Sequence, residues 1–478
     1  MSQHSDNARR KFLKKLSGTA AVLATGPAAL ASASPHTFHI LKRKSAIPAN
    51  DRITIAGIGM GIMGFGDVNT ALTQPGIELI SVADCYQGHL TRSKEVYGDQ
   101  IKTTMNYQEI MDDPSIDAVV IATPDHWHQR MAIQAMEKGK AVYCEKPMVQ
   151  YIKEGHAVIE TQKKTKKAFQ VGSQFASSLA HRKAKEFYEA GEIGQMVLAE
   201  AFFDRYDALG AWQYSIPPDA TPETCDWKMF QGDASDLPFS AERFFHWRNY
   251  RDYGTGIPGD LFVHLFTMLH TITGAIGPER IYATGGLRYW DDGRDVADVM
   301  MGLYDYPKTD RHPAFNLGLR VNFVDGSGGR TGIRIVGSEG EMDIGWNSVT
   351  VRRNKLPKAP GYGGWDTFGT FPEATQKQFE KEYKEKYAES MNEKFKPTEE
   401  TYTPPEDYGG EGMRRDHFAD FFNAMRTGEE TVEGPVFGLR AAGPALASNT
   451  SHYEKRVVYW DAKDMKEVSG EKAMGERE

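Results

Sequence analysis

A glycine-rich turn follows a short apolar run near residue 50. The β-branched run from Arg52 to Ala56 predicts a buried strand, and the pattern Gly-x-Gly-x-x-Gly comes directly after it. In such a turn the first glycine permits the tight bend, the second lets a pyrophosphate approach the backbone, and the third lets the next helix pack closely. The helix N-terminus then faces the phosphates. We expect these residues to bind a dinucleotide: Gly59, Gly61, Ile62, Met63 and Gly64.

An acidic residue ends the second expected strand, which runs from Ile77 to Ala83. Asp84 lies 20 residues beyond Gly64, where a carboxylate accepts hydrogen bonds from a ribose hydroxyl. A carboxylate at this point also repels a 2′-phosphate, so we expect NAD rather than NADP. The alternative is an ordinary solvent-facing turn aspartate.

Two polar segments follow further expected strands. The runs 117–122 and 141–144 predict strands, and a helix is expected from Trp127 to Lys138, before Gly139. Repeated β-α-β units imply a parallel, doubly wound sheet, which binds ligands beyond the carboxyl ends of its strands. The polar segments 123–128 and 145–147 follow these strands directly, so the further cofactor-binding candidates are Thr123, Pro124, His126, His128, Glu145 and Lys146.

His126 and His128 could also be interpreted as a pair of metal ligands. No cluster of acids or cysteines accompanies them in the sequence, so we expect no metal. The three cysteines, Cys85, Cys144 and Cys225, are too few and too scattered for a disulfide framework or a cysteine-based zinc site.

Length and charge limit the class of protein. The chain has 478 residues, a formal charge of −8 and 40% apolar residues, which suits two or three domains with cores of their own. The acidic balance, without a long basic run in the body, argues against a nucleic-acid partner or binding to anionic lipid.

Residues 1–33 resemble an export signal. A basic segment with the pair Arg9-Arg10 precedes a weakly apolar stretch that ends in small residues. The paired arginines, followed by Phe12 and Leu13, resemble the twin-arginine signal of bacteria, which exports folded proteins. We therefore expect a periplasmic protein whose partner is the twin-arginine export machinery. A cytoplasmic tail is the alternative, and glycines and a proline make a membrane anchor less favourable.

The motifs together resemble one family. The stretches Ala122–His128 and Cys144–Met148, with the later segments 254–265 and 417–428, are similar to the Gfo/Idh/MocA oxidoreductases, the glucose-fructose oxidoreductase and inositol dehydrogenase superfamily. The resemblance runs from about residue 50 to 460. It is specific to the superfamily but not to a substrate.

The second half of the chain changes pattern. Five β-rich runs between residues 196 and 336 predict a large open, mainly antiparallel sheet in an α+β domain. The expected divisions are a signal at 1–33, an α/β Rossmann domain at 50–175, a substrate and oligomerisation domain at 176–412 with an insertion at 354–412, and a C-terminal helix and tail at 413–478. Family members often associate through this sheet, so we expect a homo-oligomer. The aromatic insertion could form a lid, reach a neighbouring subunit or simply be solvated.

The resemblance also implies catalytic roles. Asp260 and His264 lie four residues apart on an expected helix and so share one face, although an isolated pair of this kind is often a surface ion pair. In the family the lysine of the Glu-Lys-Pro motif and this pair contact the reacting hydroxyl. Carried over, His264 is the base, Lys146 the polarising acid and Asp260 an orienting substrate ligand. The resemblance adds Gln174 as a further cofactor-binding candidate beside the substrate, and Arg182, Tyr206 and Trp212 as substrate contacts. The aromatic and basic run 246–251 suits a sugar face.

These expectations combine into a function. NAD is scarce outside the cytoplasm, so an exported dehydrogenase would need a cofactor that does not dissociate. The sequence therefore predicts an exported oxidoreductase that oxidises or reduces a hydroxyl of a sugar or glycoside, plausibly at C3. One alternative is an NAD-dependent glycosidase of the family 109 type, which works by oxidation and elimination. The other is an inactive nucleotide- or sugar-binding module.

Overall fold

The computed structural model describes residues 52–388, 390 and 395–470. The expected export signal at 1–33 lies outside these residues. Within the described part, no helix is long and apolar enough to cross a membrane.

The first domain is built on a six-stranded parallel sheet in the order β3-β2-β1-β4-β5-β6. The chain order reverses between β1 and β4, and a ligand crevice forms at such a point. The predicted α/β Rossmann domain is confirmed. Its strands are β1 (Ile53–Ile58), β2 (Ile77–Ala83), β3 (Lys102–Thr104), β4 (Ala118–Ile121), β5 (Ala141–Glu145) and β6 (Phe169–Gly172). Its helices are α2 (Ile62–Ala71), α3 (Gln87–Tyr97), α4 (Gln108–Asp112), α5 (His128–Glu137) and α6 (Ile152–Thr165).

The second domain has a ten-stranded sheet in the order β14-β13-β12-β11-β7-β10-β9-β8-β15-β16. Only β7 and β10 pair in parallel among these strands, so the predicted mainly antiparallel sheet is confirmed. The strands are β7 (Met196–Asp204), β8 (Arg280–Gly286), β9 (Val299–Tyr306), β10 (Phe315–Asn322), β11 (Arg330–Gly337), β12 (Gly340–Ile344), β13 (Val349–Arg353), β14 (Thr398–Tyr402), β15 (Val458–Asp461) and β16 (Lys466–Val468).

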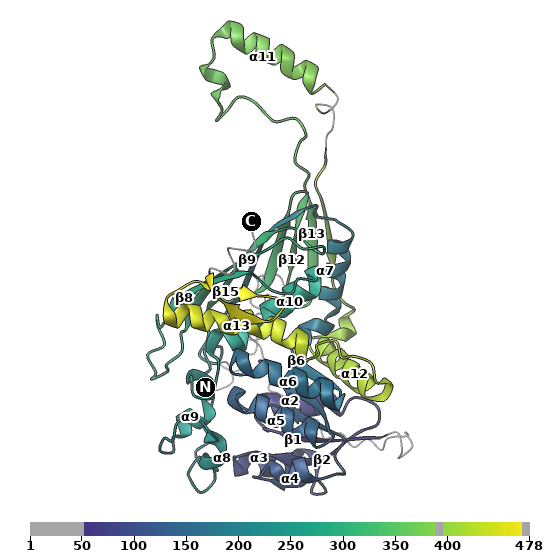
Figure 1. The fold of residues 1–478 in the computed structure, drawn as a ribbon, viewed down its shortest axis with the longest axis vertical. Coiled ribbons are helices and arrows are strands. Elements are labelled where there is room, and N and C mark those ends of the chain that lie inside the picture. Colours follow the sequence, from purple (N-terminus) through teal and green to yellow (C-terminus); the bar gives the residue numbers. More distant parts are fainter. Residues whose placement is uncertain (1–51, 389, 391–394, 471–478) are drawn as a thin grey trace, which may run out of the picture.

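The two faces of this sheet differ in their surroundings. Helices α7 (Leu179–Glu189), α10 (Val263–Thr273) and α13 (Pro435–Glu454) lie on one face (Figure 1). The opposite face carries exposed apolar side chains, among them Tyr282 and Leu303, which pair across β8 and β9. Alternation along β9 between buried and exposed residues produces this division.

Helix α12 (Gly412–Thr427) returns the chain to the Rossmann domain. Phe418, Phe421 and Phe422 pack against the first sheet, and the Phe418 ring stacks on Tyr143 of β5 with centroids 4.2 Å apart. The amphipathic pattern of this segment therefore buries its aromatic face against the parallel sheet and ties the C-terminal segment to the nucleotide fold.

The segment carrying Asp260 and His264 differs from the single α-helix expected from the sequence. A π-helical turn, η6 (Pro258–Phe262), leads directly into α10. Pro258 at the start cannot donate a backbone hydrogen bond, and π turns frequently occur at functional sites.

The described residues between 354 and 390 form an arm that stands away from both domains (Figure 1), whereas residues 398–402 of the same predicted insertion form β14 of the large sheet. The arm contains η7 (Thr367–Thr370) and α11 (Glu373–Lys386), and the aromatic rings of Tyr362, Phe379 and Tyr383 pack on one another. No described residue between 354 and 397 lines the central cavity, so the arm is not a lid over the site of its own chain.

Candidate functional site

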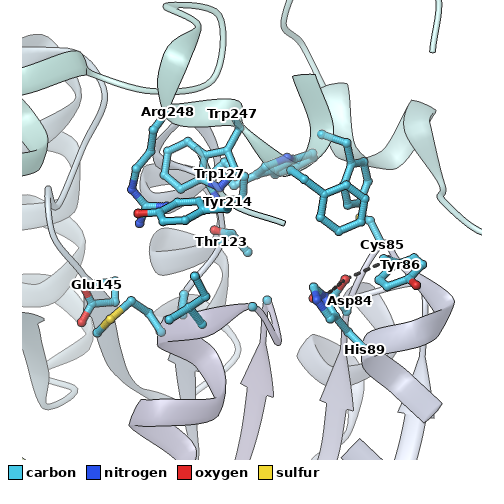
Figure 2. Close-up of a pocket in the computed structure, with 18 of the residues that line it drawn as sticks. Asp84, Cys85, Tyr86, His89, Thr123, Trp127, Glu145, Tyr214, Trp247 and Arg248 are labelled. Carbon is cyan, nitrogen blue, oxygen red and sulfur yellow. Dashed lines mark hydrogen bonds and ion pairs between the residues drawn. The ribbon is translucent and has the colours of Figure 1, made fainter. Parts of the chain in front are cut away.

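A cavity of about 800 Å³ lies where the carboxyl ends of the parallel strands face the second domain. The glycine turn and the loops after β2, β4 and β5 form one wall. The end of β7, the η6 turn and part of the segment 214–248 form the other. Figure 2 shows Tyr214, Trp247 and Arg248 across the cavity from Asp84, Tyr86 and His89.

The glycine turn has the geometry that a dinucleotide requires. Gly59 has a φ of +87°, and a Cβ there would lie 2.7 Å from the carbonyl oxygen of Ala122. A Cβ on Gly64 would lie 1.8 Å from the Gly59 oxygen, whereas a Cβ on Gly61 would meet nothing within 4 Å. The N-terminus of α2 has no side-chain cap. Its N–H groups and the open backbone beside Gly61 therefore suit a pyrophosphate.

Asp84 is fixed at the edge of this crevice. Its Oδ2 accepts a hydrogen bond from the Met60 N–H at 2.6 Å, and its Oδ1 accepts one from the Tyr86 N–H at 2.8 Å. His89 Nδ1 lies 3.2 Å from Oδ1; burial lowers the pKa of His89, but the carboxylate outweighs it and raises that pKa overall. A carboxylate oxygen accepts more than one hydrogen bond, so the lining position of Asp84 still suits a ribose hydroxyl.

Glu145 lies deeper, at the end of β5, and is buried. Burial raises the pKa of Glu145 to about 7, while Lys146 and Arg414 act in the opposite direction. Burial and the neighbouring Glu145 also raise the pKa of Asp67 on α2. Gln174 donates a hydrogen bond to Glu145 Oε1 at 3.5 Å, which places it beside the same carboxyl group.

Lys146 and Asp260 meet in the cavity although they come from different domains. Lys146 Nζ donates to Asp260 Oδ1 at 2.7 Å and to the Asp260 carbonyl oxygen at 2.9 Å. Arg248 Nε donates to the same Oδ1 at 3.2 Å. Burial would raise the pKa of Asp260, but Lys146 and Arg248 hold it well below its usual range. Asp260 is therefore a charged acceptor that fixes the ammonium group.

His264 lies one turn further along and also lines the cavity. Its ring packs between Phe175 and Phe203, with centroid separations of 5.3 and 6.2 Å. Burial first, and then the charge of Lys146, lower the pKa of His264 well below its ordinary value. The imidazole is therefore neutral at pH 7, so one of its ring nitrogens carries no proton.

The two histidines in the loop after β4 form hydrogen bonds with backbone carbonyl oxygens. His128 Nδ1 lies 2.7 Å from the Pro147 oxygen, and its Nε2 lies 2.9 Å from the Thr123 oxygen. His126 Nε2 lies 2.9 Å from the Phe230 oxygen, and burial lowers its pKa to about 4. Neither histidine lines the cavity, although Thr123 and Pro124 do. His128 holds the Lys146-Pro147 loop in place, so its contribution to a cofactor site is indirect.

Three expected substrate contacts lie away from the cavity lining. Arg182 on α7 pairs with Asp420 at 3.3 Å, and Tyr206 is 59% exposed. Trp212 is fully buried and packs edge-on against Phe323. The structure therefore does not bring these three residues to the cavity, because a residue that lies near a site in sequence can turn into the core or toward solvent.

Residues 214–253, which we call the strap, cross from the second domain to the Rossmann domain. The strap contains α8 (Trp227–Gln231), α9 (Ala241–Phe245) and η5 (Trp247–Asn249). Figure 1 shows α8 beside α3, and Phe245 at the end of α9 contacts His89 of α3, with ring centroids 6.3 Å apart. The Tyr86 hydroxyl donates to Asp219 at 2.5 Å, and the Asp226 N–H donates to the Cys85 oxygen at 2.7 Å. Rings of the strap line the crevice near Asp84: Phe230, Phe244 and Phe245.

Sequence reasoning missed several lining residues. Arg205 directly follows β7, and this position at the end of a predicted strand could have indicated that it lines the site. Trp247 and Arg248 belong to the aromatic and basic run that the sequence did single out. Trp346 and Tyr214 had no motif around them, because only the fold brings them to the cavity.

Comparison with known proteins identifies the first domain. A family model described as the oxidoreductase family with an NAD-binding Rossmann fold covers residues 53–173. This region matches the Gfo/Idh/MocA oxidoreductases.

Two curated relatives match the same part of the chain. The scyllo-inositol 2-dehydrogenase (NAD(+)) of Bacillus subtilis (strain 168) is 33% identical over 152 residues, which is 32% of this chain and 44% of that protein. A glycosyl hydrolase family 109 protein of Shewanella baltica (strain OS155) is 33% identical over 172 residues, which is 33% of this chain and 38% of that protein. The chain thus spans less than half of the length of either relative.

The whole fold resembles that of solved oxidoreductases. A levoglucosan dehydrogenase in complex with NADH and levoglucosan superimposes with a TM-score of 0.58 at 19% identity, covering 85% of this chain and 99% of that one. The likeness extends the shared fold to both domains.

The buried Glu145 carboxyl predicts a pH dependence of stability. Its pKa in the folded protein is raised to about 7, so the proton-bound form stabilises the fold at low pH, and this contribution is lost as the pH rises through 7. Between pH 5 and pH 8 the unaltered protein should lose on the order of 2 kcal/mol more unfolding free energy than Glu145→Gln, measured by urea denaturation. Equal losses of unfolding free energy in the two proteins would contradict a buried Glu145 carboxyl with a raised pKa.

Proposed function

We propose that the protein is an NAD-dependent oxidoreductase that oxidises or reduces a hydroxyl of a sugar or glycoside, with the C3 hydroxyl as the first candidate. The observation that carries this proposal is the meeting of Lys146, Asp260 and His264 in one cavity, directly beyond the glycine turn. The inositol dehydrogenase relative and the fold shared with levoglucosan dehydrogenase support a sugar or polyol as the class of substrate.

The proposed cofactor fits the residues present. Gly59, Gly61 and Gly64, with Ile62 and Met63, would hold the pyrophosphate, Asp84 the adenosine ribose, and Thr123, Pro124, Glu145 and Gln174 the nicotinamide half. NAD is favoured over NADP because the Asp84 carboxylate would repel a 2′-phosphate. The bound nicotinamide supplies the acceptor or donor of a hydride.

The chain's own groups manage the proton of the reacting oxygen. Neutral His264 accepts the proton as the alcohol is oxidised, and the ammonium of Lys146 stabilises the negative charge that develops on oxygen. Asp260 keeps Lys146 in place through the 2.7 Å ion pair and accepts a hydrogen bond from the substrate. In the reductive direction the same groups act in reverse.

Replacing Lys146 by Met tests the catalytic role of this residue. Lys146→Met keeps the length of the side chain but removes its charge, so binding of the nucleotide should persist while kcat falls by about three or more powers of ten. A panel of sugars and glycosides is followed through absorbance of the reduced nicotinamide, and products are identified by mass. A variant that retains more than a tenth of the activity would exclude Lys146 from the chemistry.

The strap supports a cofactor that does not dissociate. Its contacts with Cys85, Tyr86 and Trp127 anchor it across the crevice, and its aromatic rings cover the end of the cavity near Asp84. A nucleotide held under the strap could leave only after these contacts break. This property suits the proposed export in the folded state through a twin-arginine signal, and hence a periplasmic enzyme.

Retention of the nucleotide can be measured on protein recovered from the periplasm without added cofactor. We expect about one NAD per chain after denaturation and chromatography. Tyr86→Phe removes the hydroxyl that bonds to Asp219, so nucleotide release should become about tenfold faster.

Tyr97→Phe is the matched control, since the Tyr97 hydroxyl bonds to Asn69 and does not line the cavity. Unchanged release from Tyr86→Phe would exclude the strap as the retaining element. Absence of the protein from the periplasm would exclude export.

A redox glycosidase is the second candidate, favoured by the glycosyl hydrolase family 109 relative. Such an enzyme would use the same lysine and nucleotide but would release an aglycone without net change in the nucleotide. Nitrophenyl glycosides distinguish the two candidates, because free nitrophenol with constant nicotinamide absorbance identifies the glycosidase. An inactive binding module would give neither signal with any member of the panel.

We also propose a homo-oligomer that forms through the outer face of the large sheet. Its exposed apolar residues Tyr282, Met301 and Leu303 lie side by side on β8 and β9. Burying such a patch removes apolar surface from water. Light scattering should give a mass of at least two chains, and a monomeric mass at micromolar concentration would contradict this.

A further inference from the structure

We propose that the substrate is an acidic sugar, and that Arg205 and Arg248 bind its carboxylate beside the hydroxyl that reacts. This inference deepens the proposed function and rests on it. The juxtaposition that carries it is three cationic side chains that line one cavity, Lys146, Arg205 and Arg248, of which Lys146 and Arg248 pair with the carboxylate of Asp260.

Asp260 cannot balance these cations by itself. Its Oδ1 already receives both Lys146 and Arg248, at 2.7 and 3.2 Å. Glu145 borders the same end of the cavity, but its pKa of about 7 leaves it only partly charged at neutral pH. Asp125 also raises the pKa of Arg248, but it does not line the cavity. Its carboxylate already accepts hydrogen bonds from the Thr255 N–H and hydroxyl, at 3.0 and 2.6 Å.

Arg205 has few partners of its own. Its Nη1 donates to the Gly210 oxygen at 2.8 Å, and among the described residues it has no carboxylate within ion-pair distance. Its guanidinium lies over the rings of Phe203 and Phe323, at 5.0 and 5.7 Å from the centroids. Burial lowers the pKa of Arg205, although Asp260 acts against this. A guanidinium has five N–H donors, and a charge in such a position is costly without a counter-ion.

Arg248 is the second arginine of the proposed carboxylate site. Its guanidinium lies 4.1 Å from the centre of the Trp247 ring, and its bond to Asp260 uses Nε. The remaining N–H groups of the two arginines have no acceptor among the described residues, and both side chains line the cavity. A carboxylate can accept two such hydrogen bonds at once, in the planar geometry that suits a guanidinium.

A neutral sugar fits this charge balance less well. Its hydroxyls can accept hydrogen bonds from arginine but cannot neutralise the surplus positive charge. An oxidised nicotinamide ring would add another positive charge at the same end. The aromatic walls, Trp247 and Trp346 among them, can pack against a sugar ring whether or not the sugar is charged. The surplus of positive charge in the cavity therefore favours binding of an acidic sugar over a neutral one.

The test compares acids with their neutral counterparts on the holoenzyme loaded with reduced nucleotide, so that no oxidation occurs. The pairs are glucuronate with glucose, galacturonate with galactose, and gluconate with glucitol, each titrated by calorimetry. We expect at least one acid to bind about tenfold to a hundredfold more tightly than its partner. Arg205→Gln should remove that preference, whereas Arg92→Gln, whose arginine pairs with Glu95 on α3, should retain it.

Equal or tighter binding of every neutral sugar would overturn the inference, as would an acid preference that survives Arg205→Gln. The first outcome needs no variant, so a failure of Arg205→Gln to fold does not prevent the test. Turnover separates the inference from the proposed function. Oxidation of neutral sugars alone leaves the proposed function in place and excludes the acidic substrate. Acids that bind while no sugar, acidic or neutral, reduces NAD keep the carboxylate site but contradict the oxidoreductase.

Discussion

The ion pair between Lys146 and Asp260 is the interaction on which the rest of the site depends. It joins the end of β5 in the Rossmann domain to the η6 turn of the second domain, with 2.7 Å between Nζ and Oδ1. Both side chains are largely buried, at 10% and 12% exposure, so each charge needs the other. The pair therefore fixes the distance between the nucleotide side and the substrate side of the cavity, and removing Asp260 would leave the buried ammonium of Lys146 without its ion-pair partner.

The structure around this pair separates two electrostatic environments. Near Asp84 the crevice is lined by aromatic rings of the strap and by the uncapped start of α2. Near Asp260 it is cationic, and the neighbouring His264 is kept neutral by burial and by Lys146. A single cavity can thus hold a nucleotide at one end and give the reacting oxygen a cation and a base at the other.

Local patterns in the sequence predicted the fold and the residues at the centre of the site. The glycine spacing, the strand-ending Asp84 and the Glu145-Lys146 motif are short-range signals, and the cavity contains all of them. Asp260 and His264 were predicted on one α-helical face; both line the cavity, although the turn between them is π-helical. Tyr214 and Trp346 were beyond such reasoning, since the contact between the two domains, and not any motif, brings them to the cavity, whereas Arg205 follows directly after β7. Trp212 and Tyr206 lie away from the cavity for the same reason, because burial and loop direction depend on tertiary packing.

The central claim is that a hydride moves between a substrate carbon and a nicotinamide held beside Lys146. The most direct measurement uses a sugar that the protein converts, deuterated at each carbon that bears a hydroxyl, in a single turnover with one NAD per chain. Mass spectrometry of the nucleotide isolated afterwards should find one deuterium at C4 of the nicotinamide ring. Product formed beside an unlabelled nucleotide would contradict the account.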